Sequence, residues 1–352
     1  MDFSDLKKDI PLSQLTTIKL GGPARYFYEF VSEEELINAL LFAANNKLKI
    51  FILGGGSNVI FPDEGFNGLV LKNCIRFIES ESNNNELIIT AGSGVNWDEL
   101  VKLNVDKGYS GIECLSGIPG STGATPVQNV GAYGQEIKDT LVSVNTIERS
   151  NGEKKTFTNA DCNFGYRSSR FKFQDKDKYV ITSVTFNLKI TEPEIKYMQL
   201  SDNLPEEFFN VNTGIEKKLS IIRKSVIQLR KSKSMVIDEN DSDSVSCGSF
   251  FMNPVLNESE FNLFSLKAKD KHLIPPAFIT GREYKIPAAW LIENSGFSKG
   301  YNYNGAAISS KHTLALVNKG CKTIDIIDLS RKIQESVLLK FGLNLLPEPV
   351  IL

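Results

Sequence analysis

Histidine is the scarcest potential catalytic residue in this sequence, with only His272 and His312 among 352 residues. Because zinc sites in proteins rely heavily on histidine, a metal site built on it is not expected. A serine hydrolase could use one of the two as a base, but no serine lies in the G-x-S-x-G turn that exposes such a nucleophile. We therefore expect no metal ion.

Cysteine is also sparse and irregularly placed. The five cysteines are Cys74, Cys114, Cys162, Cys247 and Cys321. Their number is odd, and no two of them form a C-x-x-C pair. This distribution is typical of a reducing compartment and disfavours a disulfide scaffold.

Neither a strong charge bias nor a long apolar run is present. Lysine and arginine number 40 and aspartate and glutamate 42, whereas nucleic-acid-binding proteins usually carry a basic excess. No apolar run approaches the ~18 residues needed to cross a bilayer. The N-terminal M-D-F-S-D-L-K-K-D lacks the apolar core of a signal peptide. We therefore expect a cytoplasmic protein with no membrane or nucleic-acid partner.

The apolar pattern predicts an α+β protein, with two to three domains and boundaries near Asn73 and Lys233. Residues 17–30 are expected to form a strand, a turn and a second strand, and a helix should begin at Ser32, where Glu35 completes a capping box. Residues 191–212 are expected to form a loop. Further strands are expected at 49–53, 68–72, 86–91, 140–148, 154–158, 178–188 and 314–318, and further helices at 97–107, 216–233, 288–294 and 324–341.

Two glycine-rich segments are the strongest binding signals. The first glycine loop, G-G-G-S-N-V at residues 54–59, directly follows an apolar strand. Glycine lets the backbone approach a ligand, and consecutive N–H groups can hold an anion. The loop is neither G-x-G-x-x-G nor a Walker A motif, and a plain tight turn explains it equally well.

The second glycine loop, residues 117–134, is longer and carries five glycines in eighteen residues. Ordering such a loop costs conformational entropy, which favours a loop that wraps a ligand over a mere connection. Together the two loops predict one large dinucleotide cofactor touched by two domains. The polar residues of the second loop are Ser121, Thr122, Thr125, Gln128 and Asn129.

Three separate residues are candidates for catalysis. Ser249, in C-G-S-F-F-M-N-P, could donate a proton inside a pocket made by Phe250 and Phe251, although a buried strand explains this segment too. Arg167, in F-G-Y-R-S-S-R-F-K, could hold a carboxylate through two hydrogen bonds or belong to a basic surface. Glu348 lies between two prolines and could equally be a solvated carboxylate.

These segments together resemble one family, the UDP-N-acetylenolpyruvoylglucosamine reductases (MurB). The resembling motifs run in the family's order over nearly the whole chain. They are T-T-I-K-L-G-G-P-A, I-L-G-G-G-S-N-V, I-P-G-S-T-G-A-T-P-V-Q-N-V-G-A-Y-G, F-G-Y-R-S-S-R-F-K, G-S-F-F-M-N-P, P-A-A-W-L-I-E and P-E-P-V.

The resemblance implies an FAD enzyme of peptidoglycan precursor synthesis, and hence of cell-wall biogenesis. NADPH would reduce FAD, and flavin N5 would pass hydride to the enolpyruvyl methylene carbon of UDP-N-acetylglucosamine enolpyruvate. Ser249 would protonate the resulting carbanion, while Arg167 and Glu348 polarise the enolpyruvyl carboxyl group. Such chemistry needs a redox cofactor and hydrogen-bond donors where negative charge develops.

The resemblance also implies three domains, two for FAD in the manner of vanillyl-alcohol-oxidase-like flavoproteins and one for the substrate. We expect a monomer, although the sequence itself does not give the oligomeric state. Residues 1–73 with 345–352 would form the first part of the FAD-binding region, 74–233 the second part, and 234–344 the substrate domain. The residues expected at FAD are Gly54, Gly55, Gly56, Ser57, Asn58, Val59, Gly117, Ile118, Pro119, Gly120, Ser121, Thr122, Gly123, Thr125, Gln128, Asn129, Gly131, Ala132 and Tyr133.

A loop near residues 191–212 that carries Tyr197 resembles the substrate-covering tyrosine loop of the first class of these reductases. The residues expected at the substrate are Tyr166, Tyr197, Lys233 and Asn253. Met252 stands where many members have a lysine. Two alternatives stay open: a related flavin oxidase acting on another substrate, and a flavin- or nucleotide-binding module without catalysis.

Overall fold

The computed structural model describes residues 5–352. The chain divides into two compact units. Unit 1 consists of Met1–Ile10, Ala24–Gly56 and Phe66–Val236, and unit 2 consists of Pro11–Pro23, Ser57–Gly65 and Ile237–Leu352. The three-domain division expected from the sequence is finer than this one and stays a prediction.

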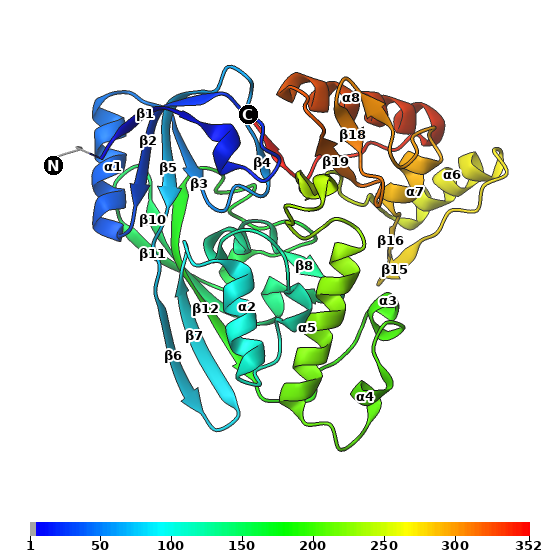
Figure 1. Ribbon diagram of the computed structural model, residues 1–352, viewed down its shortest axis with the longest axis horizontal. Coiled ribbons are helices and arrows are strands. Elements are labelled where there is room, and N and C mark those ends of the chain that lie inside the picture. Colours follow the sequence, from blue (N-terminus) through cyan, green and yellow to red (C-terminus); the bar gives the residue numbers. More distant parts are fainter. Residues whose placement is uncertain (1–4) are drawn as a thin grey trace. The chain divides into compact units, whose positions relative to one another are not determined.

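Unit 1 begins with a four-stranded sheet in which three neighbouring strands are parallel (Figure 1). Its strands, in spatial order, are β1 (Lys7–Pro11), β2 (Pro23–Phe30), β5 (Phe66–Asn73) and β3 (Ile50–Leu53). Helix α1 (Glu33–Asn45) connects β2 to β3. It begins at the predicted N-cap, because Ser32 Oγ accepts a hydrogen bond from Glu35 N at 3.1 Å. The expected capping box is not completed, because the Glu35 carboxylate accepts from Val31 N, at 2.9 Å, one residue before the cap. Its Leu36 and Leu40 are buried in the same core as Leu69 of β5.

The larger part of unit 1 is a five-stranded antiparallel sheet with helices packed against it (Figure 1). Its strands, in spatial order, are β11 (Lys154–Thr158), β10 (Leu141–Glu148), β12 (Tyr179–Lys189), β7 (Glu86–Gly92) and β6 (Ile78–Asn83). Its helices are α2 (Trp97–Asp106), α3 (Met198–Ser201), α4 (Glu206–Phe209) and α5 (Ile215–Lys231). The short hairpin of this unit is β8 (Gly131–Ala132) with β9 (Gln135–Glu136), and its 3-10 turns are η2 (Glu113–Leu115), η3 (Thr122–Ala124), η4 (Pro126–Gln128), η5 (Ile137–Asp139) and η6 (Ala160–Cys162).

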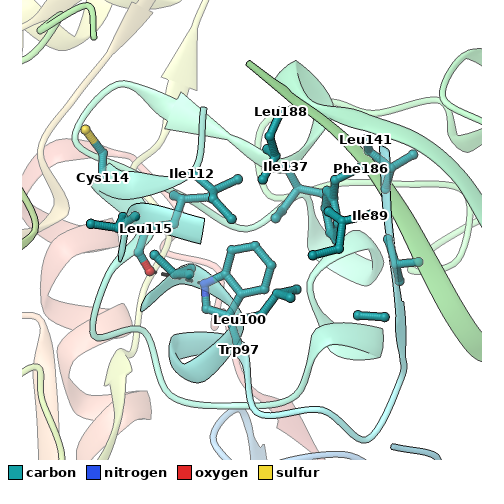
Figure 2. Close-up of a cluster of buried hydrophobic side chains, with 14 of the residues drawn as sticks. Ile89, Trp97, Leu100, Ile112, Cys114, Leu115, Ile137, Leu141, Phe186 and Leu188 are labelled. Atoms are coloured by element: carbon teal, nitrogen blue, oxygen red, sulfur yellow. Dashed lines mark hydrogen bonds between the residues drawn. The ribbon is translucent and has the colours of Figure 1, made fainter. Parts of the chain in front are cut away.

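Trp97 anchors the core between this sheet and α2 (Figure 2). Its indole is fully buried and lies 5.8 Å from the ring of Phe186, measured between centroids. The indole N–H donates to Leu115 O at 3.1 Å, which satisfies its only polar group. Because Leu115 comes just before Gly117, this bond ties the start of the second glycine loop to the core.

Unit 2 contains a four-stranded antiparallel sheet, a three-stranded sheet and three helices (Figure 1). The first sheet has the order β13 (Ser246–Ser249), β19 (Ala315–Asn318), β18 (Ala306–Ile308) and β17 (Asn302–Tyr303), and the second β14 (Val255–Leu256), β16 (Glu283–Lys285) and β15 (Phe278–Thr280). A parallel pair joins β20 (Val350–Ile351) to β4 (Val59–Ile60). The remaining elements are α6 (Glu258–Lys269), α7 (Ala288–Glu293), α8 (Thr323–Phe341), η1 (Leu12–Leu15) and η7 (Ser242–Ser244).

Helix α8 supplies much of the core of unit 2. Ile326, Leu329, Ile333 and Val337 recur every three or four residues and are fully buried. Gly342 ends the helix in a left-handed conformation, with φ of 73°, which glycine adopts without steric cost. Within the described residues, no helix combines the length and the apolar character needed to span a membrane.

The structure corrects the expected strand at the start of residues 17–30. Lys19 has a left-handed backbone with φ of 55°, and its N–H closes a turn on Thr16 O at 3.2 Å. Ile18 and Leu20 are nevertheless buried in the core of unit 2. The alternation of apolar and polar residues here reflects the burial of side chains in a turn. Within residues 17–30 only β2 is a strand. Likewise, residues 191–212 contain the short helices α3 and α4.

Candidate functional site

The two glycine loops touch each other in unit 1. A Cβ atom added to Gly55 would lie 2.5 Å from Gly120 Cα, and one added to Gly54 would lie 2.7 Å from Ser121 Oγ. Both distances are well below van der Waals contact. Glycine is therefore required at residue 55, which faces backbone atoms, whereas a side chain at residue 54 would displace the hydroxyl group of Ser121. Glycine turns of this kind, in which Gly55 is exposed, suit the phosphates of a dinucleotide.

Side chains of the second glycine loop hold the loop in shape. Thr122 Oγ1 donates to Val95 O at 3.1 Å, and Thr125 Oγ1 donates to Thr122 O at 2.8 Å. Asn129 is buried and left-handed, and its Nδ2 donates to the Glu136 carboxylate at 2.9 Å. Backbone N–H groups of the loop are bonded inside the protein as well, with Thr122 N donating to Val95 O at 2.8 Å and Gly123 N to Ser93 O at 2.9 Å.

Asp98 holds the first residue of the second glycine loop, although the sequence analysis did not single it out. Its Oδ1 accepts a hydrogen bond from Gly117 N at 2.6 Å, and both carboxylate oxygens pair with Arg223 of α5. Burial raises the pKa of Asp98, but Arg223 and the Gly117 amide outweigh this and lower the pKa overall. No local signal reveals the pair, because Arg223 is 125 residues away.

Arg167 lies beside the second glycine loop. Its Nη2 donates to Gly131 O at 2.8 Å, and its guanidinium carbon lies 5.6 Å from the centre of the Tyr166 ring. The backbone of Arg167 is left-handed, with φ of 50°, and so is that of Tyr133, with φ of 49°. Such conformations are costly for residues other than glycine, and they cluster at functional sites.

Tyr197 and Lys233 lie together with Tyr133 in unit 1. Lys233 Nζ donates to Gln199 Oε1 at 2.8 Å and lies 6.0 Å from the centre of the Tyr133 ring, which Tyr197 also contacts. Burial, followed by the charge of Arg230, lowers the pKa of Lys233. Aromatic rings and a cation at one place suit a phosphorylated ligand with a planar group.

Other candidates of the second glycine loop have contacts of their own within unit 1. Gly131 and Ala132 form β8, while Ile118 and Ala132 pack against the core of unit 1. Gln128 Oε1 accepts from Lys172 Nζ at 3.5 Å. The structure thus brings the second glycine loop, Arg167 and the tyrosine-loop residue Tyr197 together within unit 1.

Ser249 and Glu348 lie on adjacent segments of unit 2. Ser249 ends β13, and the carbonyl of the next residue, Phe250, accepts a hydrogen bond from Glu348 N at 2.8 Å. On the other side, Asn58 Nδ2 donates to Glu348 O at 3.3 Å, and Asn58 O accepts from Val350 N at 3.0 Å. Glu348 is therefore held between the serine strand and the end of the first glycine loop, although 99 residues separate it from Ser249 (348 − 249).

The aromatic neighbours of Ser249 have a different role from the one expected. Phe250 and Phe251 are 0% and 1% exposed and belong to the core of unit 2, with ring centroids 5.0 Å apart. They fix the backbone after Ser249, which itself is only half-buried. Asn253 Oδ1 accepts from Ala288 N at 2.8 Å, at the start of α7. A contact from Asn253 to a substrate would therefore use Nδ2.

Within the part of the chain that the structure describes, no group of three or more histidine, cysteine, aspartate or glutamate side chains is placed to hold a metal ion. Unit 1 instead offers glycine backbone, the rings of Tyr133 and Tyr197 and the cations Arg167 and Lys233, and unit 2 offers the hydroxyl group of Ser249. These features fit a dinucleotide cofactor and an anionic substrate better than a metal-dependent hydrolysis.

Comparison with known proteins gives agreement over nearly the whole chain. Residues 24–158 match the family model of an FAD binding domain, and residues 240–352 match that of the UDP-N-acetylenolpyruvoylglucosamine reductase C-terminal domain. The UDP-N-acetylenolpyruvoylglucosamine reductase of Thermobifida fusca is 40% identical over 354 residues, covering 98% of this chain and 97% of its own length. The UDP-N-acetylenolpyruvoylglucosamine reductase of Streptomyces coelicolor is 40% identical over 350 residues, covering 97% of this chain and 89% of its own length.

A solved structure has the same fold. The crystal structure of UDP-N-acetylenolpyruvylglucosamine reductase from Thermus caldophilus superposes with a TM-score of 0.68 and 22% identity, covering 98% of this chain and 99% of its own. The α+β fold expected from the sequence is thereby confirmed.

Proposed function

The chain belongs to the UDP-N-acetylenolpyruvoylglucosamine reductase family, and on this premise we propose that it reduces UDP-N-acetylglucosamine enolpyruvate to UDP-N-acetylmuramate with electrons from NADPH. It is then a UDP-N-acetylmuramate dehydrogenase of peptidoglycan precursor synthesis. The observation that carries this proposal is similarity at 40% identity over 98% of the chain. Monomeric state and cytoplasmic location remain predictions.

FAD is the cofactor, and the FAD binding domain match on residues 24–158 supports this. The close contact of Gly55 with Gly120 leaves bare backbone on both glycine loops, which fits the phosphates of FAD. Bound FAD would supply two-electron transfer between NADPH and the enolpyruvyl double bond. Neither loop contains histidine or cysteine, so we expect the cofactor to be held without a covalent bond.

Ser249 and Glu348 have complementary roles in this proposal. Ser249 donates a proton to the substrate carbon next to the carboxyl group, because reduction leaves negative charge there. Glu348 donates a hydrogen bond to the carboxyl group or its enol form. The backbone contact between Glu348 N and Phe250 O, at 2.8 Å, supports their acting at one place.

Arg167 and the substrate-binding residues complete the assignment. Arg167 stabilises the developing negative charge of the enolpyruvyl carboxylate as a cation. Tyr197 and Lys233 bind the uridine diphosphate part, with Tyr166 and Asn253 as further substrate contacts. The cationic and aromatic surroundings of Tyr133 support this role for Tyr197 and Lys233.

A paired half-reaction experiment tests the proposal. The purified protein should be yellow, NADPH should bleach it without oxygen, and UDP-N-acetylglucosamine enolpyruvate should restore the colour. Faster recolouring by oxygen than by this substrate would favour a flavin oxidase. A yellow protein that NADPH does not bleach would favour a binding module, and a colourless one that takes up no FAD would overturn the cofactor assignment.

A further inference from the structure

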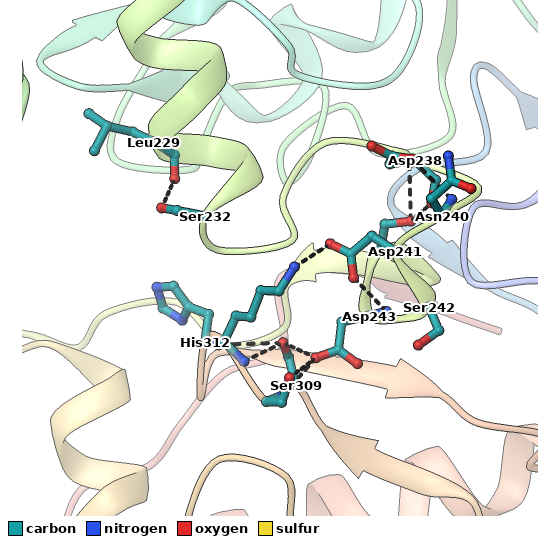
Figure 3. A network of polar contacts seen from close by, with 12 residues as sticks. Leu229, Ser232, Asp238, Asn240, Asp241, Ser242, Asp243, Ser309 and His312 are labelled. Carbon is teal, nitrogen blue, oxygen red and sulfur yellow. Dashed lines mark hydrogen bonds and ion pairs between the residues drawn. The ribbon is translucent and has the colours of Figure 1, made fainter.

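We propose that Asp243 is a positioning residue for Ser249, acting through residues 309–314, the loop that joins β18 to β19. This inference rests on the proposed role of Ser249 in proton donation. All the residues involved belong to unit 2, and Figure 3 labels Asp243, Ser309 and His312 among them. No family motif considered above includes Asp243 or this loop.

Asp243 is the centre of a fully bonded network (Figure 3). It is 5% exposed, and its Oδ2 accepts from Ser309 Oγ at 2.9 Å, Ser310 N at 2.7 Å and Ser310 Oγ at 2.8 Å. Its Oδ1 pairs with Lys319 Nζ at 2.5 Å. Burial raises the pKa of Asp243, but Lys319 and both serines outweigh it and lower the pKa overall. The buried group is therefore an anion at neutral pH.

The bonds of Asp243 order the whole loop. Ser309 Oγ, which donates to Asp243, also accepts from Lys311 N at 3.1 Å and His312 N at 3.4 Å (Figure 3). Further along, His312 Nδ1 accepts from Leu314 N at 3.1 Å. A neutral imidazole in this position carries its proton on Nε2. One carboxylate thus fixes the loop backbone and, through it, the tautomer of His312.

The end of the loop holds the catalytic serine. Phe250 N donates to Leu314 O at 2.7 Å, and Ser249 is paired with Ala315. The register between β13 and β19 is irregular from Ser246 to Ser249, and Gly248 is left-handed with φ of 72°. Regular hydrogen bonding between β13 and β19 therefore does not set the position of Ser249. The contacts at Leu314 and Ala315 set it, and these depend on the loop that Asp243 holds.

The test combines kinetics with a readout that needs no turnover. Because the chain has only two histidines, the imidazole nitrogen signals of His312 are easily resolved by NMR, and a His272→Gln variant assigns them. Asp243→Ala removes the network, whereas Asp243→Asn keeps an acceptor for the serines and loses only the ion pair. Lys311→Ala is the matched control, since its exposed ion pair with Asp241, at 2.9 Å, lies in the same loop.

Asp243→Ala should retain FAD reduction by NADPH but slow reoxidation by saturating enolpyruvyl substrate ~10-fold or more, because small misplacements of a reacting group are costly. Its His312 signals should move toward the average of the two tautomers. Asp243→Asn should show a smaller loss of reoxidation rate and a smaller shift of the His312 signals than Asp243→Ala. Lys311→Ala should match the parent in both measurements.

Unchanged His312 signals in folded Asp243→Ala or Asp243→Asn would overturn the inference, and so would equal slowing of both half-reactions. Failure of the proposed function is a different result: the parent itself would not be reoxidised by the substrate. In that case the His312 signals still decide whether Asp243 orders the loop.

Discussion

Tyr197 meets Tyr133 edge to face in unit 1: the ring centroids lie 5.6 Å apart and the ring planes are inclined by 86°. This arrangement is a favourable one for aromatic pairs and contributes about 0.5–1.5 kcal/mol beyond burial. It involves no hydroxyl group. The ring of Tyr197 therefore holds the start of α3 on Tyr133, and the hydroxyl group takes no part in this contact.

Tyr197→Phe should weaken substrate binding about 5–10-fold, because it removes one hydrogen bond while keeping the ring contact. Tyr197→Ala should weaken it further, since the ring contact is lost too. Lys233→Ala should act in the same direction by removing a cation near phosphate. Titration of substrate against flavin absorbance measures these affinities, and reduction by NADPH should change less.

Lys217→Ala is the control for these variants. Lys217 lies on α5, and its ion pair with Glu207, at 3.4 Å, is exposed. If Tyr197→Phe and Lys233→Ala bind substrate as tightly as this control, the assignment to the class with a tyrosine loop is wrong.

Ser249→Ala should separate the two half-reactions. Reduction of FAD by NADPH needs no proton from Ser249, whereas reoxidation by the enolpyruvyl substrate should slow by at least ~10²-fold. Ser249→Cys should keep more activity than Ser249→Ala, because a thiol can also donate a proton. Stopped-flow absorbance measures each step, and equal slowing of both would indicate a structural serine.

Glu348→Ala should slow reoxidation ~10³-fold, and Glu348→Gln should retain part of the rate because an amide still donates a hydrogen bond. Both substitutions keep the backbone bonds of Glu348 to Phe250 and Asn58, so any loss belongs to the side chain. The same stopped-flow measurement applies, and both variants should still accept electrons from NADPH.

Truncation provides the control for Glu348. Ending the chain after Glu348 removes β20 and keeps the carboxyl group, whereas ending it before Glu348 removes both. Chain ends usually tolerate trimming, so the shorter deletion should be mild and the longer one severe. Full turnover after the longer deletion would exclude Glu348 from the mechanism.

Asp98→Asn should weaken FAD affinity ~10-fold, because a hydrogen bond to a charged group contributes about 1.5–3 kcal/mol and Asp98 orders the start of the second glycine loop. Flavin fluorescence titration measures the affinity. The control is Lys102→Ala, which breaks an exposed pair with Asp106 on the same helix. FAD affinity equal to that of the parent would show that the loop does not depend on Asp98.

The pH dependence of stability provides a second measurement on Asp98. Its pKa is lower in the folded protein than in the unfolded chain, so its contribution is fully present above the unfolded pKa of about 3.9. That contribution is lost as pH falls through the folded pKa. The difference in unfolding free energy between the parent and Asp98→Asn should therefore shrink below about pH 4.

Local signals predicted local structure well. The N-cap at Ser32 was predicted because Glu35 follows three residues later. The Asn257–Glu260 capping box at the start of α6 has the same spacing, and it was not predicted. The expected strand near Lys19 was wrong because apolar alternation reports burial, and burial in a turn produces the same pattern.

Long-range relationships were beyond a single sequence. Gly55 indicated that another group approaches the backbone closely, but only the structure shows that this group is Gly120. The pairing of Asp98 with Arg223 and the bonds of Asp243 to Ser309 depend on how separate elements pack, and none of these side chains lies in a recognisable motif. The candidate residues came from the resemblance to a family, and their roles stay predictions.

The pairing of β20 with β4 has a consequence for synthesis in the cell. Chains emerge from the ribosome from their N-terminus, so β4 stays unpaired with β20 while all the elements from β5 to α8 are made. Unit 1 has all its segments once Val236 has emerged, whereas unit 2 stays incomplete until residues 350–351 arrive. Glu348 precedes them, so a nascent chain that has completed unit 2 already carries its carboxyl group.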